Sequence, residues 1–291
     1  MNTITVNAYA KINLGLDVIR KRPDGYHDVC MIMQSLDLHD IITISRIPST
    51  GIKIRTNLSY LPNDQGNLVY RAAALFLEAA RIKDGLNITL EKNIPVAAGL
   101  AGGSSDAAAT LKGLNELYQT GLSTEELKGL GVKIGADVPY CVQLGTALSE
   151  GIGEVLTPLP AIPECTVLLV KPDISVSTKY VYENLRLTGT VTHPDIAGMR
   201  HALEQNDLSS LAKTMDNLLQ TVTVKDYPII TDIKRKMLEL GALTSLMSGS
   251  GPTVFGIYKN VELAKKAFNY FKRHKHYGKQ VFLTKPYYPE R

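Results

Sequence analysis

The sequence has few of the features that mark secreted, membrane-spanning or zinc-binding proteins. Its three cysteines are odd in number and far apart, and no Cys-x-x-Cys pair occurs. This argues against a disulfide framework or a structural zinc site and fits a reducing cytoplasm. No apolar run approaches the length of a membrane span, and no basic segment followed by an apolar run opens the chain. The sequence therefore predicts a soluble cytoplasmic protein with no membrane partner.

Strong charge of one sign is also missing. The chain carries 32 Lys and Arg against 28 Asp and Glu, a net charge of +4 over 291 residues. Its basic residues are scattered, which gives no support for a nucleic-acid partner and weak support for an anionic small molecule. A hydrophobic fraction of 44% is typical of a globular protein. The length suits one large or two modest domains, in either a monomer or a homodimer.

Apolar periodicity predicts both strands and helices in the first half of the chain. Alternation of apolar and polar residues indicates strands, whereas apolar residues three or four apart indicate helices. The predicted strands are 4–19, 41–47, 52–55 and 86–91, with a hairpin within 146–156. The predicted helices are 69–80, 104–118 and, from a capping box at Ser123, 123–133.

The character of the chain changes near residue 158, where three prolines occur within six residues. Beyond them we expect a buried strand at 166–170, helices across 194–240, a glycine-rich turn and strand within 246–258, a helix at 261–271 and a strand at 280–284. Strands interleaved with helices in this way indicate an α+β fold. We predict two domains, 1–158 and 159–291.

A glycine-rich segment between a predicted strand and a predicted helix is the most informative motif. It is called the glycine loop below and comprises Pro95, Val96, Ala97, Ala98, Gly99, Leu100, Ala101, Gly102, Gly103, Ser104 and Ser105. Glycines let a ligand approach the backbone, and the start of a helix favours an anion. A second serine supplies an additional hydroxyl for a phosphate oxygen or a magnesium ion. The order strand, glycine loop, helix thus predicts a phosphate site.

Two familiar phosphate motifs do not fit this loop. It has no Gly-Lys-Ser/Thr ending, which a Walker A loop requires, and its spacing differs from the Gly-x-Gly-x-x-Gly dinucleotide fingerprint. A tight connection followed by an ordinary serine N-cap is the alternative.

Polar residues in two other segments have types suited to catalysis. Lys11 and Asn13 lie two apart on a predicted strand and therefore share one face, where they suit an oxygen-rich ligand. A half-exposed strand with ordinary polar residues is the alternative. Asp137 follows a glycine turn and precedes Pro139, so its carboxylate is held on a fixed backbone and could accept a hydroxyl proton. A capping or turn aspartate is the alternative there.

Two further segments are typical of turns with ligand-binding potential. Asp24-Gly25 is a turn signal, and Tyr26 and His27 follow it with side chains that could stack on a planar base and hydrogen-bond to it. A surface turn with a packed tyrosine explains the same residues. Met247–Phe255 alternates Gly and Ser before a strand, which offers backbone N–H groups to an anion or forms a plain hairpin turn.

Taken together and in this order, these segments resemble the GHMP kinases, the superfamily of galactokinase, homoserine kinase and mevalonate kinase. Pro-x-x-x-Gly-Leu-x-Gly-Gly-Ser-Ser and Ser-Gly-Ser-Gly-Pro-Thr look like two signatures of this superfamily. Ala-Lys-Ile-Asn-Leu, Asp-Gly-Tyr-His and Gly-Ala-Asp-Val-Pro resemble a member of the isoprenoid pathway that does not use mevalonate. That member acts on a cytidyl diphosphate sugar alcohol.

The resemblance implies a two-lobed fold. Its N-terminal lobe, 1–158, would be ribosomal-S5-like and bind ATP, and its C-terminal lobe would be ferredoxin-like, with the active site in the cleft between them. It also implies transfer of the ATP γ-phosphoryl group to a tertiary 2-hydroxyl. Asp137 would take the hydroxyl proton, and Lys11 would keep Asp137 ionised and steady the substrate oxygen.

The remaining roles follow from the same resemblance. The glycine loop would wrap the ATP phosphates, with Ser105 near Mg²⁺. Tyr26 and His27, helped by Asn13, would bind the cytidine end, and Tyr182 would be the second aromatic residue against the cytosine. Two alternatives are a related kinase that acts on homoserine or mevalonate and a nucleotide-sensing homologue without catalysis.

Overall fold

A computed structural model of the protein describes residues 2–187, 189 and 191–289. These residues form two compact units, each assembled from separate stretches of the chain. Unit 1 takes in Met1–Ala10, Leu38–Val96 and Ala101–Leu144, and unit 2 takes in Lys11–Asp37, Ala97–Leu100 and Gly145–Arg291. The units thus interleave along the sequence, whereas the predicted domains 1–158 and 159–291 are continuous. The boundary near residue 158 stays a prediction.

The sheet of unit 1 is built from parts of two long strands and two short ones. β1 (Thr3–Lys21) contributes its N-terminal end and β2 (His27–Ile47) its C-terminal half. That half of β2 pairs antiparallel with β4 (Gly85–Glu91), and β4 pairs in parallel with β3 (Ile52–Thr56). The apolar residues that alternate along β4 are buried, as their spacing predicts.

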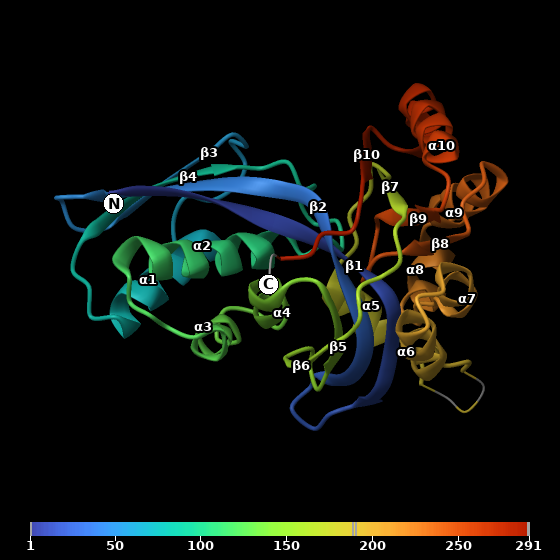
Figure 1. Cartoon of the computed structure of the whole chain (residues 1–291), viewed down its shortest axis with the longest axis horizontal. Coiled ribbons are helices and arrows are strands. Elements are labelled where there is room, and N and C mark those ends of the chain that lie inside the picture. Colours follow the sequence, from blue (N-terminus) through green and yellow to red (C-terminus); the bar gives the residue numbers. More distant parts are fainter. Residues whose placement is uncertain (1, 188, 190, 290–291) are drawn as a thin grey trace. The chain divides into compact units, whose positions relative to one another are not determined.

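Helices cover one face of this sheet (Figure 1). α2 (Gly102–Tyr118) and α1 (Leu68–Ala79) pack side by side, and α3 (Thr124–Gly131) and α4 (Val138–Gln143) contact α2. Gly113 allows α2 to approach the sheet closely, because a Cβ atom there would lie 3.1 Å from Ile44 and 3.3 Å from Val6. The capping box predicted at Ser123 is present, with Glu126 as its partner.

The pairs among β2, β5 (Thr146–Glu150) and β6 (Val155–Pro158) and those of a second sheet in unit 2 are antiparallel. The N-terminal half of β2 pairs with β5, and β5 forms a hairpin with β6. The second sheet has the order β10-β7-β9-β8. Its strands are β7 (Thr166–Lys171), β8 (Thr244–Met247), β9 (Val254–Tyr258) and β10 (Gln280–Thr284). The continuous apolar run in β7 is buried, which fits a central strand covered on both faces.

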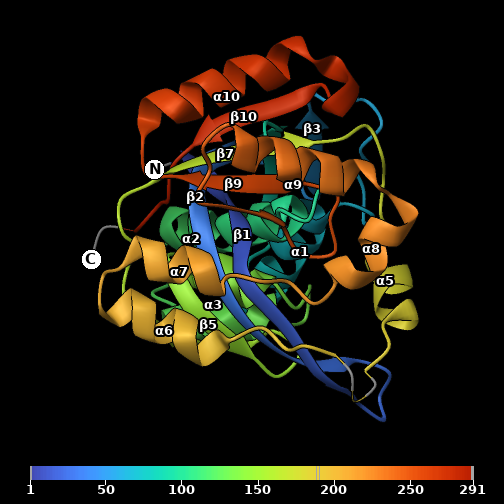
Figure 2. The same ribbon diagram turned by 90° about the vertical axis from the view of Figure 1, so that its right-hand side faces the viewer.

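The helices of unit 2 occupy most of its sequence. α10 (Val261–Arg273) packs against β10 and β7, and α9 (Ile229–Glu239) packs against β8 and β9 (Figure 2). The remaining helices are α5 (Thr178–Asn184), α6 (Ile196–Glu204), α7 (Leu208–Thr214) and α8 (Gln220–Asp226), and a 3₁₀ turn spans Lys275–Tyr277. The predicted α+β class is confirmed.

The sequence did not predict the first half of β2 or the short helices α4 and α5. β2 begins at His27, well before the strand predicted at 41–47. Its first half buries polar as well as apolar residues, so apolar and polar residues do not alternate there. α4 and α5 are only 6 and 7 residues long, too short for a helical period to emerge from the sequence.

Candidate functional site

The glycine loop leads into a helix whose first amides have no side-chain cap. Ala101 is the N-cap of α2 and makes no capping hydrogen bond through its side chain. The first i→i−4 bond runs from the Ser105 amide to the Ala101 carbonyl, at 2.8 Å. The amides of Gly102, Gly103 and Ser104 precede it and have no partner within the helix. Such a helix start, at the positive end of the helix dipole, is suited to bind an anion.

The conformation of the loop depends on more than its glycines. Ala97 and Ala101 have φ values of 50° and 55°, in the left-handed region that alanine rarely adopts. Each such residue costs roughly 1–2 kcal/mol relative to a right-handed conformation, so the surrounding structure must hold the loop in place. No sequence pattern indicated this strain, because alanine is compatible with ordinary turns.

Two loop glycines face protein atoms rather than open space. Gly99 has a φ of 75°, and a Cβ atom there would lie 2.2 Å from the Ser248 carbonyl oxygen. A Cβ atom on Gly102 would lie 3.2 Å from the Lys92 ammonium nitrogen and 3.1 Å from Ile94. Ligand approach was the expected reason for these glycines, but close packing of the backbone also requires them.

Ser105, predicted to lie near a magnesium ion, has a buried side chain with partners inside the protein. Its side chain is only 2% exposed. The Ser105 hydroxyl donates to the Tyr9 carbonyl at 2.6 Å and lies 3.3 Å from Cys141 Sγ. This hydroxyl therefore links α2 to β1 and α4 inside unit 1. Ser104, one residue earlier, is half-buried.

Lys11 and Asn13 share a face of β1, as predicted, and this face is buried. The Lys11 ammonium donates to Asn13 Oδ1 at 2.7 Å, and Asn13 Nδ2 contacts Met31 Sδ at 3.4 Å. The exposed fractions of Lys11 and Asn13 are 4% and 1%, so a half-exposed strand is excluded as the explanation. The Lys11 amide donates to the Leu100 carbonyl at 3.1 Å, which joins β1 to the glycine loop within unit 2.

The predicted Gly-Ser segment forms a tight turn beside the glycine loop. The Ser248 hydroxyl donates to the Gly99 carbonyl at 2.9 Å. Asn217, which the sequence did not single out, donates from its amide group to the Met247 and Gly249 carbonyls at 2.7 and 2.8 Å. Asn217 is fully buried, and its two hydrogen bonds hold the backbone of this turn in place. A lone asparagine among helices gives no pattern by which it could have been found.

The aromatic residues expected at the cytidine end lie in unit 2. The Asp24 carboxylate accepts from the Tyr26 amide at 3.0 Å, which forms the predicted turn, and Gly25 has a φ of 88°. The Tyr26 side chain is 59% exposed. The His27 and Tyr182 rings are 5.1 Å apart and inclined by 35°. Burial, followed by the nearby Lys21 charge, lowers the pKa of His27, which favours the neutral imidazole at pH 7.

Asp137 is the residue immediately before α4 in unit 1. It is the N-cap of this helix by position, yet its side chain does not cap the helix amides. The ordinary capping role that the sequence left open is therefore excluded. The side chain is half-buried, and Pro139 follows in the first turn.

Unit 1 contains a buried group of three charged residues that the sequence did not indicate. The Lys92 ammonium donates to Asp40 and, at 2.7 Å, to Asp106. All three side chains are at most 5% exposed. Asp106 Oδ1 is buried and accepts no hydrogen bond from the described residues. Burial strongly raises the pKa of Asp106, only partly offset by the charge of Lys92.

The pH dependence of the unfolding free energy, compared between the wild type and Asp106→Asn, tests the raised pKa of Asp106. Because the folded-state pKa of Asp106 lies above the unfolded one, the folded protein binds this proton more tightly. The associated stability is present below the unfolded pKa and is lost as pH rises through the folded pKa. We expect the unfolding free energy of the wild type to fall relative to that of Asp106→Asn as pH rises from about 4. Urea unfolding of both proteins at several pH values measures this difference, and a constant difference would contradict the raised pKa.

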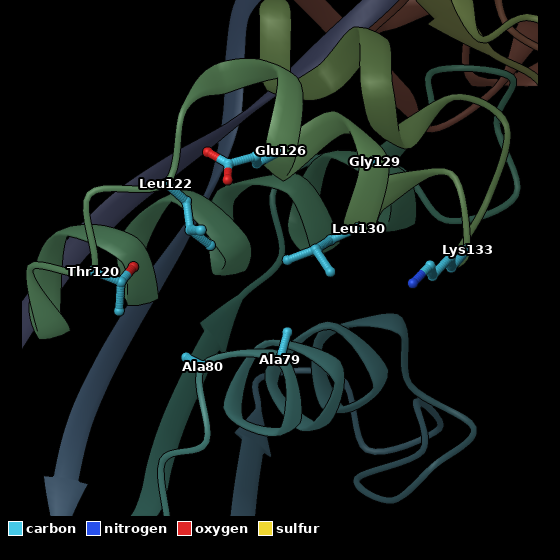
Figure 3. A pocket seen from close by; sticks show the side chains of 8 residues that line it. All are labelled: Ala79, Ala80, Thr120, Leu122, Glu126, Gly129, Leu130 and Lys133. Carbon is cyan, nitrogen blue, oxygen red and sulfur yellow. The ribbon is translucent and has the colours of Figure 1, made fainter.

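A cavity of about 680 Å³ lies between the end of α1 and the segment that runs from Thr120 to Lys133. Ala79 and Ala80 line one side, and Leu122, Leu130 and other residues of the α2–α3 segment line the other (Figure 3). None of the residues that line the cavity belongs to the glycine loop.

The described residues contain neither a metal-binding cluster nor a helix suited to span a membrane. Among the described residues, no group of three or more His, Cys, Asp or Glu side chains is arranged to hold a metal ion. Nor does any helix of the described chain combine the length and apolar character that crossing a membrane requires.

The fold and the glycine loop together define an α+β protein with an uncapped helix start of the kind that suits an anion. Models of the GHMP kinase N-terminal and C-terminal domains match residues 67–145 and 199–276. The chain belongs to the GHMP kinases, a family of small-molecule kinases that use ATP as phosphate donor. The resemblance seen in the sequence is confirmed.

Individual relatives are similar over nearly the whole chain. A protein of Lachnoclostridium phytofermentans named 4-diphosphocytidyl-2-C-methyl-D-erythritol kinase is 58% identical, over 98% of both chains. A protein of the same name from Acetivibrio thermocellus is 49% identical, over 92% of this chain and 94% of its own.

Solved structures show the same fold. A crystal structure of 4-(cytidine 5′-diphospho)-2C-methyl-D-erythritol kinase, 31% identical, matches 98% of this chain and 100% of its own with a TM-score of 0.83. Homoserine kinase from Cytophaga hutchinsonii, 21% identical, covers 98% of this chain and 95% of its own with a TM-score of 0.81. At that identity, the likeness to homoserine kinase extends to the fold alone.

Proposed function

We propose that this protein transfers the γ-phosphoryl group of ATP to the 2-hydroxyl of 4-diphosphocytidyl-2-C-methyl-D-erythritol, in isoprenoid precursor biosynthesis. The observation that carries the proposal is the 58% identity, over 98% of both chains, to a protein named for this activity. The Asp24–His27 turn and the Gly135–Pro139 segment support it, because these are the motifs that distinguish this kinase from other family members.

Asp137 and Lys11 are the proposed catalytic residues. Asp137 takes the proton of the acceptor hydroxyl, and the resulting oxygen attacks the γ-phosphorus. The bond from that phosphorus to the bridging oxygen breaks, and ADP leaves with the bond electrons. Lys11 steadies the negative charge that develops on the attacking oxygen. Its burial and its bond to Asn13 hold the ammonium in a single position. Phosphoryl transfer depends mainly on positioning and charge neutralisation, which suits this residue set.

The glycine loop, Pro95–Ser105, is the proposed site for the ATP phosphates. The uncapped amides of Gly102, Gly103 and Ser104 fit this role, because they are hydrogen-bond donors at the positive end of α2. Mg²⁺ would accompany ATP and neutralise phosphate charge. The half-buried Ser104 is a better candidate than the buried Ser105 to lie near the ion.

Tyr26, His27, Tyr182 and Asn13 are the proposed residues for the cytidyl end of the substrate. The 59% exposure of Tyr26 leaves its ring accessible to a planar base, and the contact between His27 and Tyr182 provides a second aromatic group in unit 2. Asn13 supplies a buried carboxamide on the strand face that it shares with Lys11. Binding at the cytidyl end would orient the distant hydroxyl for reaction.

Tyr26→Ala should weaken binding of the cytidyl substrate with little effect on turnover. Loss of one base–aromatic stack costs roughly 1–3 kcal/mol, equivalent to a rise in KM for this substrate of about 5- to 150-fold. Steady-state kinetics at saturating ATP measure the change. Tyr60→Ala is the matched control, because Tyr60 is also an exposed tyrosine, at 68%, and lies outside the proposed site. An unchanged KM in Tyr26→Ala would count against stacking.

An ADP-release assay with three acceptor alcohols tests the proposed function. The cytidyl substrate should support ADP formation, whereas mevalonate and homoserine should support none above the background. Preference for either of those alcohols would identify a different kinase of the family. Nucleotide binding without transfer to any of the three would identify a non-catalytic homologue.

A further inference from the structure

Both ends of the glycine loop are attached to one buried lysine. Asp40 holds the entrance to the loop, because its Oδ1 accepts from the amides of Asn93 and Ile94 at 2.5 and 2.7 Å. These residues immediately precede Pro95. The other oxygen of Asp40 accepts from the Lys92 ammonium, so the backbone at the entrance is tied to Lys92 through a single carboxylate.

The same ammonium holds the exit from the loop. Lys92 donates to Asp106 at 2.7 Å, and Asp106 follows Ser105 in the first turns of α2. Lys92 also supports Gly102 from behind, because a Cβ atom on Gly102 would lie 3.2 Å from its nitrogen. The entrance and the uncapped start of α2 therefore share a single buried charged group in unit 1.

We propose that Lys92 is a positioning residue for nucleotide binding: through Asp40 and Asp106 it fixes the two ends of the glycine loop at the separation that ATP phosphates require. This inference rests on the proposed role of the loop as the phosphate site. Two carboxylates face one ammonium in the interior, and one oxygen of Asp106 has no partner among the described residues. Within this group of three residues, no other side chain can replace the Lys92 ammonium as the donor.

Strain in the loop explains why such a device is needed. Ala97 and Ala101 are held in left-handed conformations that an unconstrained loop would leave. Release of one end would allow the amides of Gly102 and Gly103 to rotate away from a common point. Displacement of binding groups by about 1 Å is enough to reduce activity on the order of a hundredfold.

Lys92→Met is the direct test. It removes the ammonium and keeps much of the apolar stem. We expect KM for ATP to rise by about tenfold or more, while KM for the cytidyl substrate changes by less than about twofold. Without catalysis, the increase in thermal unfolding temperature that a non-hydrolysable ATP analogue produces in the wild type should be largely lost. An unchanged KM for ATP together with a wild-type thermal shift would overturn the proposal.

Arg46→Met controls for a general loss of stability. It also removes a cation from an ion pair in unit 1, the one with Asp84, but this pair lies on the partly exposed surface. We expect it to leave KM for ATP unchanged even where the unfolding temperature falls. An equal rise in KM for ATP in both variants would overturn the proposal, because it would show that any destabilisation of unit 1 has this effect.

Asp106→Asn provides a second test that does not require Lys92→Met to fold. Its carboxamide oxygen still accepts from Lys92, so the link at α2 is weakened rather than removed. We expect a smaller rise in KM for ATP, about threefold, in the same direction. A rise in KM for the cytidyl substrate alone would overturn the proposal. If the wild type binds the ATP analogue but does not phosphorylate the cytidyl substrate, the proposed function fails, and the thermal shifts still test the role of Lys92.

Discussion

Asp137→Asn is expected to lower kcat by about 10²- to 10⁴-fold while KM for the cytidyl substrate changes little. The carboxamide has nearly the same shape as the carboxylate but cannot take the proton of the acceptor hydroxyl. The Asp137 side chain does not cap α4, so the substitution removes no helix cap. Steady-state kinetics measure kcat and KM, and thermal unfolding checks that the variant is folded.

The pattern of the kinetic loss distinguishes a base from a binding group. Loss of a group that acts only in the transition state lowers kcat and kcat/KM by equal factors, whereas loss of a binding group raises KM. A turnover rate near that of the wild type in Asp137→Asn would remove Asp137 from the role of base. Lys11→Met should also lower kcat, because it removes the cation proposed to stabilise the attacking oxygen.

Gly99→Ala is expected to have the second largest effect. Its φ of 75° disfavours any residue with a Cβ atom, and that atom would lie 2.2 Å from the Ser248 carbonyl oxygen, which belongs to the backbone. Relief requires the glycine loop to move away from the Ser248 turn and breaks the bond from the Ser248 hydroxyl to the Gly99 carbonyl. We expect a loss of roughly 2–4 kcal/mol in the free energy of unfolding and a marked rise in KM for ATP.

Gly129→Ala is the matched control for that variant. Gly129 lies within α3, and a Cβ atom there would meet nothing within 4 Å. Alanine is favoured over glycine inside a helix, so this substitution should stabilise the protein by about 0.5–1 kcal/mol and leave KM for ATP unchanged. Urea unfolding of the two variants gives the comparison. Equal stability of Gly99→Ala and the wild type would contradict the close approach of the loop to the Ser248 turn.

The sequence predicted those elements whose signals are local. The capping box at Ser123 and Glu126 fixed the start of α3, and alternation fixed β4, because both patterns depend on residues close together in the chain. β2 is longer than the strand predicted at 41–47, because its first half buries polar residues such as Gln34 and Ser35, which hide the strand pattern. Such residues in a strand appear only once their partners are known.

In the candidate site, too, only features that depend on residues close together in the chain could be predicted. Alternation along β1 was enough to place Lys11 and Asn13 on one face, but it did not indicate that this face is buried. Ser105 looked like a ligand-binding serine by position, yet its hydroxyl bonds to Tyr9, a residue far away in the sequence. Lys92 carried no signal at all, because its partners Asp40 and Asp106 are distant along the chain.

Phosphorus NMR of the reaction product is the most direct test of the proposed function. After incubation with ATP, Mg²⁺ and the cytidyl substrate, we predict one new phosphomonoester signal beside the intact diphosphate signals. A phosphate on the tertiary 2-hydroxyl has no proton on the adjacent carbon, so this signal should show no three-bond splitting from a carbinol proton. A split phosphomonoester signal, or ADP formation with no new phosphomonoester, would contradict the assignment.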